Sequence, residues 1–359
     1  MDSLLGERLK KLDGPILVTG HTGFKGTWLT LLLEELGVSV AGFALPPLED
    51  SLFTRLGRKN KIEETYGDIR NLTLVKEVFN RIQPSAVVHM AAQPLVIKSY
   101  ETPIETFDTN VMGTVHVIDT AVRSSSVKGV VAVTTDKVYR NDESGKKFLE
   151  SDPLSGEDPY SASKVGTESV VKAYQNISTI IGGPPIVVVR SGNVVGGGDL
   201  SENRLMPDLI RCLNNKSQIS IRNPESTRPW QHVLDPLAGY LLSLERALSD
   251  GEHAAYNFGP QGYSLSVKNV TEIALKHWDR SLTFQNVNLV ENLQEVESVQ
   301  LNLDSKKAEE NLSWKPCWSQ ADAIAATVEW WKSTLISKKN PIELCRVEIR
   351  HLLEVNQGN

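Results

Sequence analysis

Residues 15–37 read "PILVTGHTGFKGTWLTLLLEELG" and join a short β-branched run, a glycine-rich turn and a stretch with apolar residues at helical spacing. This order predicts a strand, a tight turn and a helix. Gly20, Gly23 and Gly26 form a G-x-x-G-x-x-G pattern in the turn. Such glycines allow a pyrophosphate to approach the backbone, and the helix N-terminus attracts its charge. The pattern alone is weak, but its place between strand and helix favours a dinucleotide site over a purely structural turn.

Similar apolar runs follow along the first half of the chain, at 38–45, 61–69, 85–92, 129–135 and 185–193. Helix-length segments such as 71–83 and 110–125 separate most of them. Strands that alternate with helices predict right-handed βαβ units and a parallel sheet covered on both faces. The predicted fold class is therefore α/β, with a doubly wound parallel Rossmann sheet.

The regular alternation ends near residue 194, where glycine-rich, helical and short strand-like segments follow one another. A strand-like run at 254–260 is expected to rejoin the main sheet. We expect a smaller, mixed α/β substrate-binding domain built from interleaved segments. The predicted division is an NAD(P)-binding Rossmann domain at 1–193, rejoined by 233–260, and a substrate-binding domain at 194–232 and 261–359.

Composition limits the classes of function. The chain has 359 residues, 40% of them hydrophobic, and a formal net charge of -6, which argues against nucleic acid or an anionic membrane as a general partner. No window holds about 18 uninterrupted apolar residues, and the N-terminus lacks the apolar core of a signal peptide. Three scattered cysteines suit neither a disulfide framework nor a metal site. We expect a cytoplasmic protein without a bound metal.

The adenosine end of the expected dinucleotide site has no clear acidic partner. The second predicted strand ends in "GFALPP", without the carboxylate that usually binds a ribose 2′-hydroxyl, so the choice between NAD and NADP stays open. Lys25 could favour a 2′-phosphate or be a solvated turn lysine. Asp68 in "GDI" could bind the adenine edge or be a turn aspartate. Ala91 and Ala92, after the fourth predicted strand, could border the cofactor or only pack.

The "YSASK" segment places Tyr160 and Lys164 four residues apart on one helical face. A phenol has a pKa near 10, but a neighbouring ammonium and a positively charged nicotinamide both favour the phenolate. Tyr160 could then take a hydroxyl proton while hydride leaves the same carbon. A Tyr-x-x-x-Lys pair is common by chance. Here it follows a strand that ends in "TTDKVY" (134–139), in a chain that already carries the glycine turn.

With these motifs the chain resembles the extended short-chain dehydrogenase/reductase family over nearly its whole length, and within it the nucleotide-sugar 4,6-dehydratases. The resemblance implies CDP-glucose or a related nucleotide sugar as substrate, loss of water to a 4-keto-6-deoxy product, and an NAD that is regenerated in each cycle, with NADP not excluded. It also implies a homodimer or homotetramer. The segments that carry it are "VTGHTGFKGTWL", "HMAAQPLV", "TTDKVY", "GEDPYSASK", "RSGNVVGGGD", "RNPESTRPWQHVLDPLAGYL" and "LNLDSKKAEENLSWKP".

The resemblance gives "TTDKVY" a chemical role. It implies that Asp136 is the acid that protonates the departing C6 hydroxyl, that Lys137 holds the position of the C5 base, and that Thr135 binds near the C4 oxygen. The related dTDP-glucose dehydratases usually carry glutamate where Lys137 stands, so lysine favours the CDP-sugar branch. Lys137 must be neutral to act and Asp136 protonated, which one shared proton would satisfy. The alternative is an ordinary Asp–Lys contact at a strand end.

Four residues are candidates for the sugar-nucleotide side. Arg228 in "TRPWQHV" could bind a pyrophosphate bidentately, as the matching arginine of related enzymes does. Arg204 and Arg222 are weaker candidates, and surface ion pairs would explain them equally well. Asn193 could bind a substrate phosphate or ribose, as the resemblance implies, or it could simply suit a turn. The implied cofactor site comprises Gly20, Thr22, Gly23, Phe24, Lys25, Gly26, Asp68, Ile69, Ala91, Ala92 and Gln93, with Tyr160 and Lys164.

Two other functions remain open from the sequence. A 4-epimerase, or a dehydratase for another nucleotide, would share the glycine turn and Tyr160, although an epimerase needs no acid–base pair like Asp136 and Lys137. A noncatalytic NAD(P) sensor could dispense with all of these catalytic groups, so their joint presence argues against it.

Overall fold

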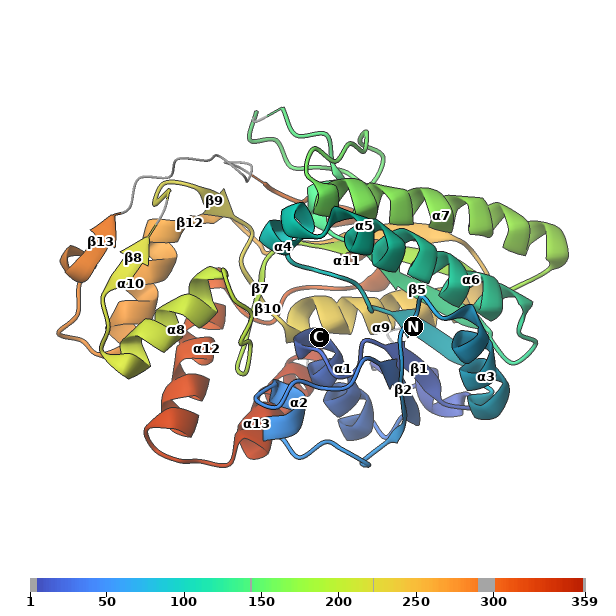
Figure 1. Ribbon diagram of the computed structural model, residues 1–359, viewed down its shortest axis with the longest axis horizontal. Helices are drawn as coiled ribbons and strands as arrows, with labels where there is room; N and C mark the ends of the chain where they lie inside the picture. Colours follow the sequence, from blue (N-terminus) through green and yellow to red (C-terminus); the bar gives the residue numbers. More distant parts are fainter. Residues whose placement is uncertain (1–4, 143, 222, 290–300, 358–359) are drawn as a thin grey trace.

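The computed structural model describes residues 5–142, 144–221, 223–289 and 301–357. Its centre is a seven-stranded sheet in the order β11-β6-β5-β4-β1-β2-β3, in which every pairing is parallel (Figure 1). The predicted doubly wound parallel sheet is confirmed. Its strands are β1 (Ile16–Thr19), β2 (Val40–Ala44), β3 (Glu63–Tyr66), β4 (Ala86–His89), β5 (Gly129–Val133), β6 (Ile186–Ser191) and β11 (Ala254–Phe258).

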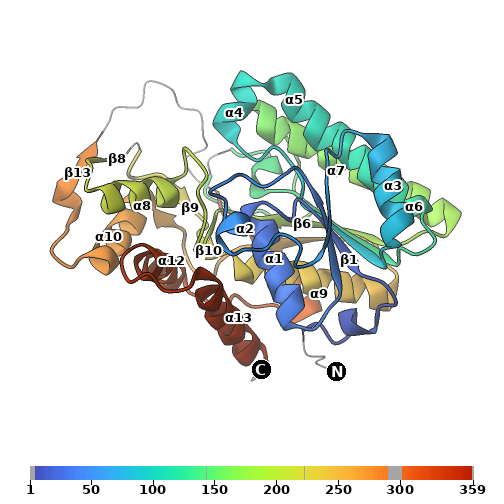
Figure 2. The ribbon, with the colours of Figure 1, turned by 60° about the horizontal axis from the view of Figure 1, so that its bottom comes forward.

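Helices cover both faces of the sheet, as Figure 2 shows. One face packs against α1 (Phe24–Glu35) and α9 (Leu234–Asp250). The other face lies under α3 (Leu72–Ile82), α6 (Gly113–Arg123) and α7 (Pro159–Ile181). Alternate residues of β1 serve the two layers, with Leu17 in the cluster of α3 and α6, and Ile16 and Val18 in the cluster of α1. Strands buried on both faces explain the continuous apolar runs in the sequence.

Short helical segments connect these elements and lie mostly beyond the sheet. Helix α2 packs against α1, whereas α4 and α5 pack against α7. A π-helical turn, η2, precedes α6, so the helix expected from residue 110 becomes regular only at Gly113. The segments are η1 (Leu9–Lys11), α2 (Leu52–Arg55), α4 (Val96–Glu101), α5 (Pro103–Phe107), η2 (Asp108–Met112), η3 (Asp136–Val138) and α11 (Lys306–Leu312).

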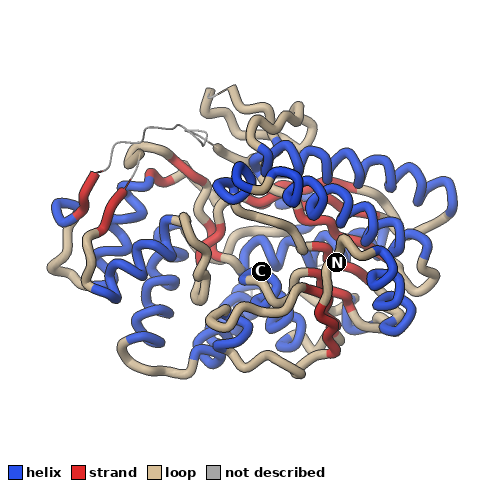
Figure 3. Tube along the Cα trace, viewed as in Figure 1, coloured by secondary structure: helices blue, strands red, loops and turns tan. Residues whose placement is uncertain are grey.

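The later segments build a second group of elements beside the sheet (Figure 3). Three two-stranded sheets pair β10 with β7, β12 with β9 and β13 with β8. Helix α12 packs against α8 and α10, whereas α13 returns to α1 and α9. The bounds are β7 (Val194–Val195), α8 (Leu205–Asn215), β8 (Ile219–Ile221), β9 (Thr227–Arg228), β10 (Gln231–His232), β12 (Leu265–Ser266), α10 (Val267–Trp278), η4 (Phe284–Asn286), β13 (Val287–Leu289), α12 (Gln320–Leu335) and α13 (Pro341–Gln357).

The division into two domains stays a prediction. Among its interleaved segments, 254–258 forms β11, the sheet strand beside β6, and α11 packs against α9 and β11. None of the described helices has the length and apolar character needed to cross a lipid bilayer.

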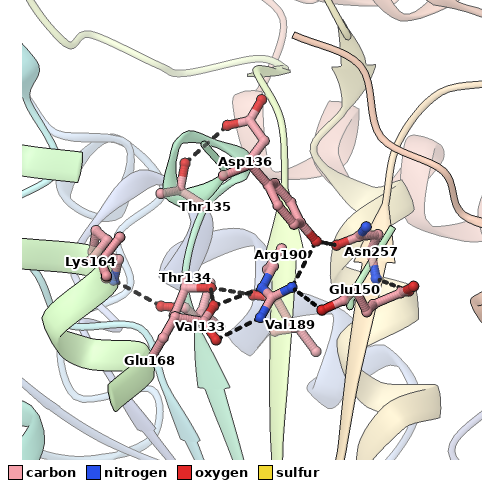
Figure 4. A network of polar contacts seen from close by, with 12 residues as sticks. Val133, Thr134, Thr135, Asp136, Glu150, Lys164, Glu168, Val189, Arg190 and Asn257 are labelled. Carbon is pink, nitrogen blue, oxygen red and sulfur yellow. Dashed lines mark hydrogen bonds and ion pairs between the residues drawn. The ribbon is translucent and has the colours of Figure 1, made fainter. Parts of the chain in front are cut away.

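A buried ion pair joins α7 to the sheet (Figure 4). Arg190 on β6 donates through Nε and Nη2 to the two carboxylate oxygens of Glu168, each at 2.8 Å. Glu168 also accepts from Thr134 Oγ1 at 2.6 Å, at the end of β5. Arg190 Nη1 reaches Tyr139 OH at 2.7 Å, and that hydroxyl donates to Asn257 of β11 at 2.7 Å. The pair therefore fixes α7 against three neighbouring parts of the sheet.

Removing one partner of this pair should destabilise the fold strongly. Arg190→Met leaves the Glu168 carboxylate buried without its counter-charge, and we expect a loss of about 3–5 kcal/mol in the free energy of unfolding, measured by urea denaturation. Arg123→Met, which breaks the exposed Arg123–Asp119 pair on α6, is the matched control and should leave stability nearly unchanged. Equal midpoints for the two variants would show that the buried pair is not a structural anchor.

Candidate active site

The glycine turn after β1 is shaped so that only small residues fit. Gly20 has φ +80°, and a Cβ there would lie 3.0 Å from the backbone of Ala91. A Cβ at Gly26 would overlap the carbonyl oxygen of Gly20. Gly23 precedes the first residue of α1, Phe24, and Thr22 Oγ1 ties the turn to Leu45 O at 3.0 Å. The glycines thus allow a tight turn directly before a helix N-terminus, a position that suits a phosphate group.

Lys25 turns its side chain into the fold. Its Nζ donates to Ser191 Oγ at 2.9 Å and to Tyr240 OH at 3.1 Å. The side chain therefore points toward the end of β6, and neither into solvent nor toward the tip of β2, where an adenosine 2′-phosphate would bind. Burial, with a smaller contribution from the charge of Arg204, lowers the pKa of Lys25 to about 7.

The residues after β3 already have partners. The Asp68 carboxylate binds the Arg70 guanidinium at 2.7 and 3.0 Å, and that hydrogen bond holds the pKa of Asp68 below its usual value. Ile69 is buried against Gly113 at the start of α6. Asp68 is therefore part of an ion pair with Arg70, in addition to its place in the turn. An adenine contact by either residue stays a prediction.

The loop after β4 borders the glycine turn. Ala91 N–H donates to Thr19 Oγ1 at 3.2 Å, which places this backbone beside the end of β1. Gln93 is buried, and its Nε2 donates to Leu95 O and Thr106 Oγ1 at 3.1 and 3.0 Å. The Gln93 side chain therefore stabilises its own loop. Ala92 is half-buried beside it.

Tyr160 and Lys164 lie in the first two turns of α7. The helix begins with a capping box between Asp158 and Ser161, and this fixes where Tyr160 stands. Burial raises the pKa of Tyr160 to about 12, opposed first by the nearby Thr135 hydroxyl. Lys164 Nζ donates to Val133 O at 2.9 Å, and burial lowers the pKa of Lys164 to about 8.

Asp136–Val138 form the short 3-10 turn η3, whose N-cap is Thr135, shortly after β5 ends at Val133. Thr135 Oγ1 donates to Asp136 Oδ1 at 3.0 Å, whereas Asp136 Oδ2 has no hydrogen-bond partner among the described residues. Asp136 is 1% exposed, and burial raises the pKa of its carboxyl, opposed first by the charge of Lys137. Lys137 is half-buried. The turn therefore holds a buried acid beside an amine, next to Tyr160.

The candidates on the sugar-nucleotide side are placed unequally. Arg228 is buried, and its charge lowers the pKa of Asp136. Arg204 binds Asp199 at 3.4 Å, and its charge lowers the pKa of Tyr160. Asn193 contributes its carbonyl oxygen to Gln231 N–H at 3.0 Å, beside β7 and β10. The prediction for Arg222 falls outside the described residues. Among the residues that are described, no group of three His, Cys, Asp or Glu side chains could hold a metal ion.

Structure adds site residues that sequence reasoning missed. Asn110 Oδ1 accepts from Gln93 N–H and its Nδ2 donates to Ser163 Oγ, both at 2.8 Å, so it joins the loop after β4 to α7. An asparagine inside a predicted helix was the available signal, because asparagine is a poor helix former. Glu168 follows Lys164 by four residues and so shares its face of α7.

A doubly wound sheet with this glycine turn and the Tyr160–Lys164 pair defines an extended short-chain dehydrogenase/reductase. The chain belongs to the GDP-mannose 4,6 dehydratase family, whose model matches residues 17–327. The family expected from the sequence motifs is thereby confirmed.

The chain is similar to enzymes that act on different nucleotide sugars. The chain is 40% identical over 329 residues to a CDP-glucose 4,6-dehydratase of Salmonella typhimurium, covering 89% of this chain and 90% of that one. DesIV, a dTDP-glucose 4,6-dehydratase from Streptomyces venezuelae solved as a double mutant with NAD bound, is 26% identical, with a TM-score of 0.77 over 88% of this chain and 96% of that one. A UDP-glucose 4-epimerase of Thermotoga maritima, 22% identical with a TM-score of 0.77 over 89% and 99% of the two chains, shares the fold.

Lys25 should give the fold a distinct dependence on pH. Its pKa is about 7 in the folded chain, below the ordinary value of 10.5, so the unfolded chain binds the extra proton between these values. The contribution of Lys25 to the free energy of unfolding should therefore rise with pH across this window, by at most about 1.4 kcal/mol per pH unit.

Urea denaturation of the wild type and Lys25→Met at pH 7.0, 8.0 and 9.0 (about one-unit steps) would measure this contribution as the difference between the two proteins. We expect the free energy of unfolding of Lys25→Met to exceed that of the wild type by the largest margin, or to fall short of it by the smallest, at the lowest pH. Lys146→Met, at a lysine paired with Asp152 on the surface, is the control. If the difference in free energy of unfolding between the two proteins stays constant with pH, burial does not lower the pKa of Lys25.

Proposed function

We propose that the chain is a CDP-glucose 4,6-dehydratase that converts CDP-D-glucose to CDP-4-keto-6-deoxy-D-glucose and water. One observation carries the proposal: the buried acid Asp136 and the amine Lys137 stand together beside Tyr160. Oxidation alone, or epimerisation, needs only the phenol, whereas elimination of water needs a further acid and a further base. The 40% identity to a CDP-glucose 4,6-dehydratase supports the CDP-sugar as substrate.

NAD fits the residues of the glycine turn. A Cβ at Gly20 would meet the backbone of Ala91, and one at Gly26 would meet the backbone of Gly20, so the tight turn before α1 requires glycine. Bound there, NAD would accept a hydride from C4 of the glucose and return it to C6. Gly20, Gly23 and the start of α1 would hold its pyrophosphate. The inward direction of Lys25 removes it as a partner for a 2′-phosphate and so supports NAD over NADP.

Tyr160 serves as the base that takes the C4 hydroxyl proton. Burial raises the pKa of this phenol to about 12 in the site without NAD, and the positive charge of a bound nicotinamide would favour the phenolate that a base requires. The Thr135 hydroxyl and the charge of Arg204 both oppose the effect of burial. Their combined action favours the phenolate, and Lys164 adds a positive charge on the same helical face.

Asp136 serves as the acid for the departing C6 hydroxyl and Lys137 as the base at C5. Burial raises the pKa of Asp136, which favours the protonated carboxyl that an acid requires. Its Oδ2 has no partner in the described part of the chain and can face the substrate. Lys137 lies next to it along the chain, so acid and base can act in one elimination.

Cationic side chains support the nucleotide diphosphate. Arg228 is buried near Asp136, and Arg204 lies near Tyr160. A guanidinium can bind phosphate oxygens bidentately, so we assign the pyrophosphate to Arg228, with Arg204 and Asn193 as further contacts.

The enzyme is further proposed to be cytoplasmic and to self-associate as a homodimer or homotetramer. Cys212, Cys317 and Cys345 are all free thiols, which supports a reducing compartment. Helix α5 exposes Ile104 and Phe107 beside α7, and an apolar surface of this kind supports contact with a second copy. Light scattering of the purified chain measures the assembly.

The direct test is incubation of the NAD-loaded protein with CDP-glucose. We expect a product lighter by one water, a 4-keto group and no net consumption of NAD. Parallel reactions with dTDP-, UDP- and GDP-glucose determine the nucleotide. An unchanged CDP-glucose in the presence of bound NAD would refute the proposal, and a 4-epimer would identify an epimerase.

Lys137→Met should separate oxidation from elimination. Without a base at C5 we expect product formation to fall by roughly 10²–10⁴-fold, whereas the reduction of NAD on mixing with substrate, followed by absorbance, should persist. Lys146→Met serves again as the control, because Lys146 is exposed and pairs with Asp152. If Lys137→Met forms product at the wild-type rate, Lys137 is not the base.

A further inference from the structure

Proton accounting in the proposed reaction leaves one proton on the wrong side chain. Oxidation breaks the C4 O–H bond and leaves its proton on Tyr160. Elimination breaks the C6–O bond, and a proton from Asp136 turns the departing oxygen into water. Lys137 takes the C5 proton and gives it back to C5, while the hydrogen and electron pair that left C4 end at C6. Each cycle therefore ends with one proton too many on Tyr160 and one too few on Asp136.

A single hydroxyl lies between these two groups. Thr135 Oγ1 donates to Asp136 Oδ1 at 3.0 Å (Figure 4). The same hydroxyl lies close enough to the phenol of Tyr160 to lower the pKa of that phenol. Thr135 Oγ1 is also held from the backbone, since it accepts from Lys137 N–H at 3.4 Å. A hydroxyl can donate once and accept twice, so it can bridge a phenol and a carboxylate in both directions.

Burial separates this chain of groups from bulk water. The exposed fractions are 8% for Tyr160, 7% for Thr135 and 1% for Asp136. A nucleotide sugar seated against them would reduce these fractions further. Direct exchange with solvent would therefore have to wait for product to leave, whereas a transfer through Thr135 does not.

We propose that the Thr135 hydroxyl returns the proton from Tyr160 to Asp136 at the end of each cycle. This inference rests on the proposed function. In the transfer, the Tyr160 O–H bond breaks as a proton joins Thr135 Oγ1, and the original Thr135 O–H proton moves to Asp136 Oδ1. The products are a phenolate and a carboxylic acid, which are the forms that the next cycle requires. A half-turn about the Asp136 Cβ–Cγ bond presents the acid to the next substrate.

The surrounding charges suit a proton that is held at either end. Asp136 feels the cations Lys137, Arg228 and Lys25, which stabilise its carboxylate after elimination. At the other end, Arg204 favours the Tyr160 phenolate, while Asp136 and Asp158 oppose it. Thr135 can donate to whichever partner is the anion, so each end state keeps a charge-assisted hydrogen bond.

Two substitutions at one position test the relay. Thr135→Val keeps the shape of the side chain and removes the hydroxyl, whereas Thr135→Ser keeps the hydroxyl. Each NAD-loaded variant is mixed rapidly with CDP-glucose, quenched at intervals, and its product counted per active site.

For Thr135→Val we expect close to one product per site, followed by turnover slowed by roughly 10²-fold relative to that first event. The slow phase should accelerate as the pH falls and when a small acid such as formic acid is added, because either can protonate Asp136. Thr135→Ser should show neither the burst nor the response. Equal slowing of every turnover in Thr135→Val, without a response to formic acid, would mean that Thr135 only positions the substrate, and unchanged turnover would exclude it altogether.

The wild-type enzyme provides a second measurement, which does not depend on whether Thr135→Val folds. A pH indicator in weakly buffered solution records protons during the first turnover, and binding of CDP alone gives the baseline. The relay predicts no release and re-uptake above this baseline. A transient of about one proton per site would overturn it. If the wild type forms no product from CDP-glucose, the proposed function fails first, so the two failures are distinguishable.

Discussion

The buried Arg190–Glu168 pair is the constraint on which the site depends. Its two hydrogen bonds of 2.8 Å connect the middle of α7 to β6. Glu168 stands four residues after Lys164, and Lys164 stands four residues after Tyr160, so one face of α7 carries the anchor and both catalytic candidates. Because Thr134 also donates to Glu168, the same carboxylate fixes the residue that precedes Thr135 and Asp136. One ion pair thus sets the position of the phenol relative to the acid.

Charge balance explains how a buried carboxyl persists in this site. Asp136 is desolvated, which raises its pKa, yet Lys137, Arg228 and Lys25 all favour its ionised form. Burial thus favours the protonated carboxyl while the three cations favour the carboxylate, and the proposed role of Asp136 as an acid uses both forms. Desolvation also lowers the pKa of Lys25 to about 7 and of Lys164 to about 8. Both lysines therefore bind their protons more weakly than exposed lysines would.

Local patterns predicted the fold correctly, because the physical causes of these patterns are local. They also indicated the catalytic candidates. A β-branched run followed by glycines and a helix needs no distant partner to be recognised, and Tyr160 and Lys164 meet through helix geometry alone. The direction of Lys25 was not predictable in this way. Ser191 and Tyr240, which bind it, lie 166 and 215 residues away along the chain.

Other contacts that the sequence does not indicate also depend on how the chain folds. Nothing in "GDI" indicates that Arg70 neutralises Asp68, and nothing near Gln93 indicates that its amide closes a loop with Leu95 and Thr106. Arg190 lies within the apolar run at 185–193, and nothing in that run indicates its partner Glu168, which lies on a different element. A polar residue inside a run of valines should be paired once buried, so its presence predicts a partner without identifying it.

The spacing of four along α7 has a consequence for how the site tolerates change. A shift of α7 that weakens Arg190–Glu168 would move Tyr160 and Lys164 together, since all lie on one rigid helix or contact it. Asp136 would stay with β5 and its short turn, so the distance between phenol and acid would change while each group kept its own neighbours. Proton transfer depends steeply on such distances, and a displacement near 1 Å can cost about 10²-fold in rate. Thr135 lies between the two groups. A shift of α7 would therefore first slow the proton transfer through Thr135.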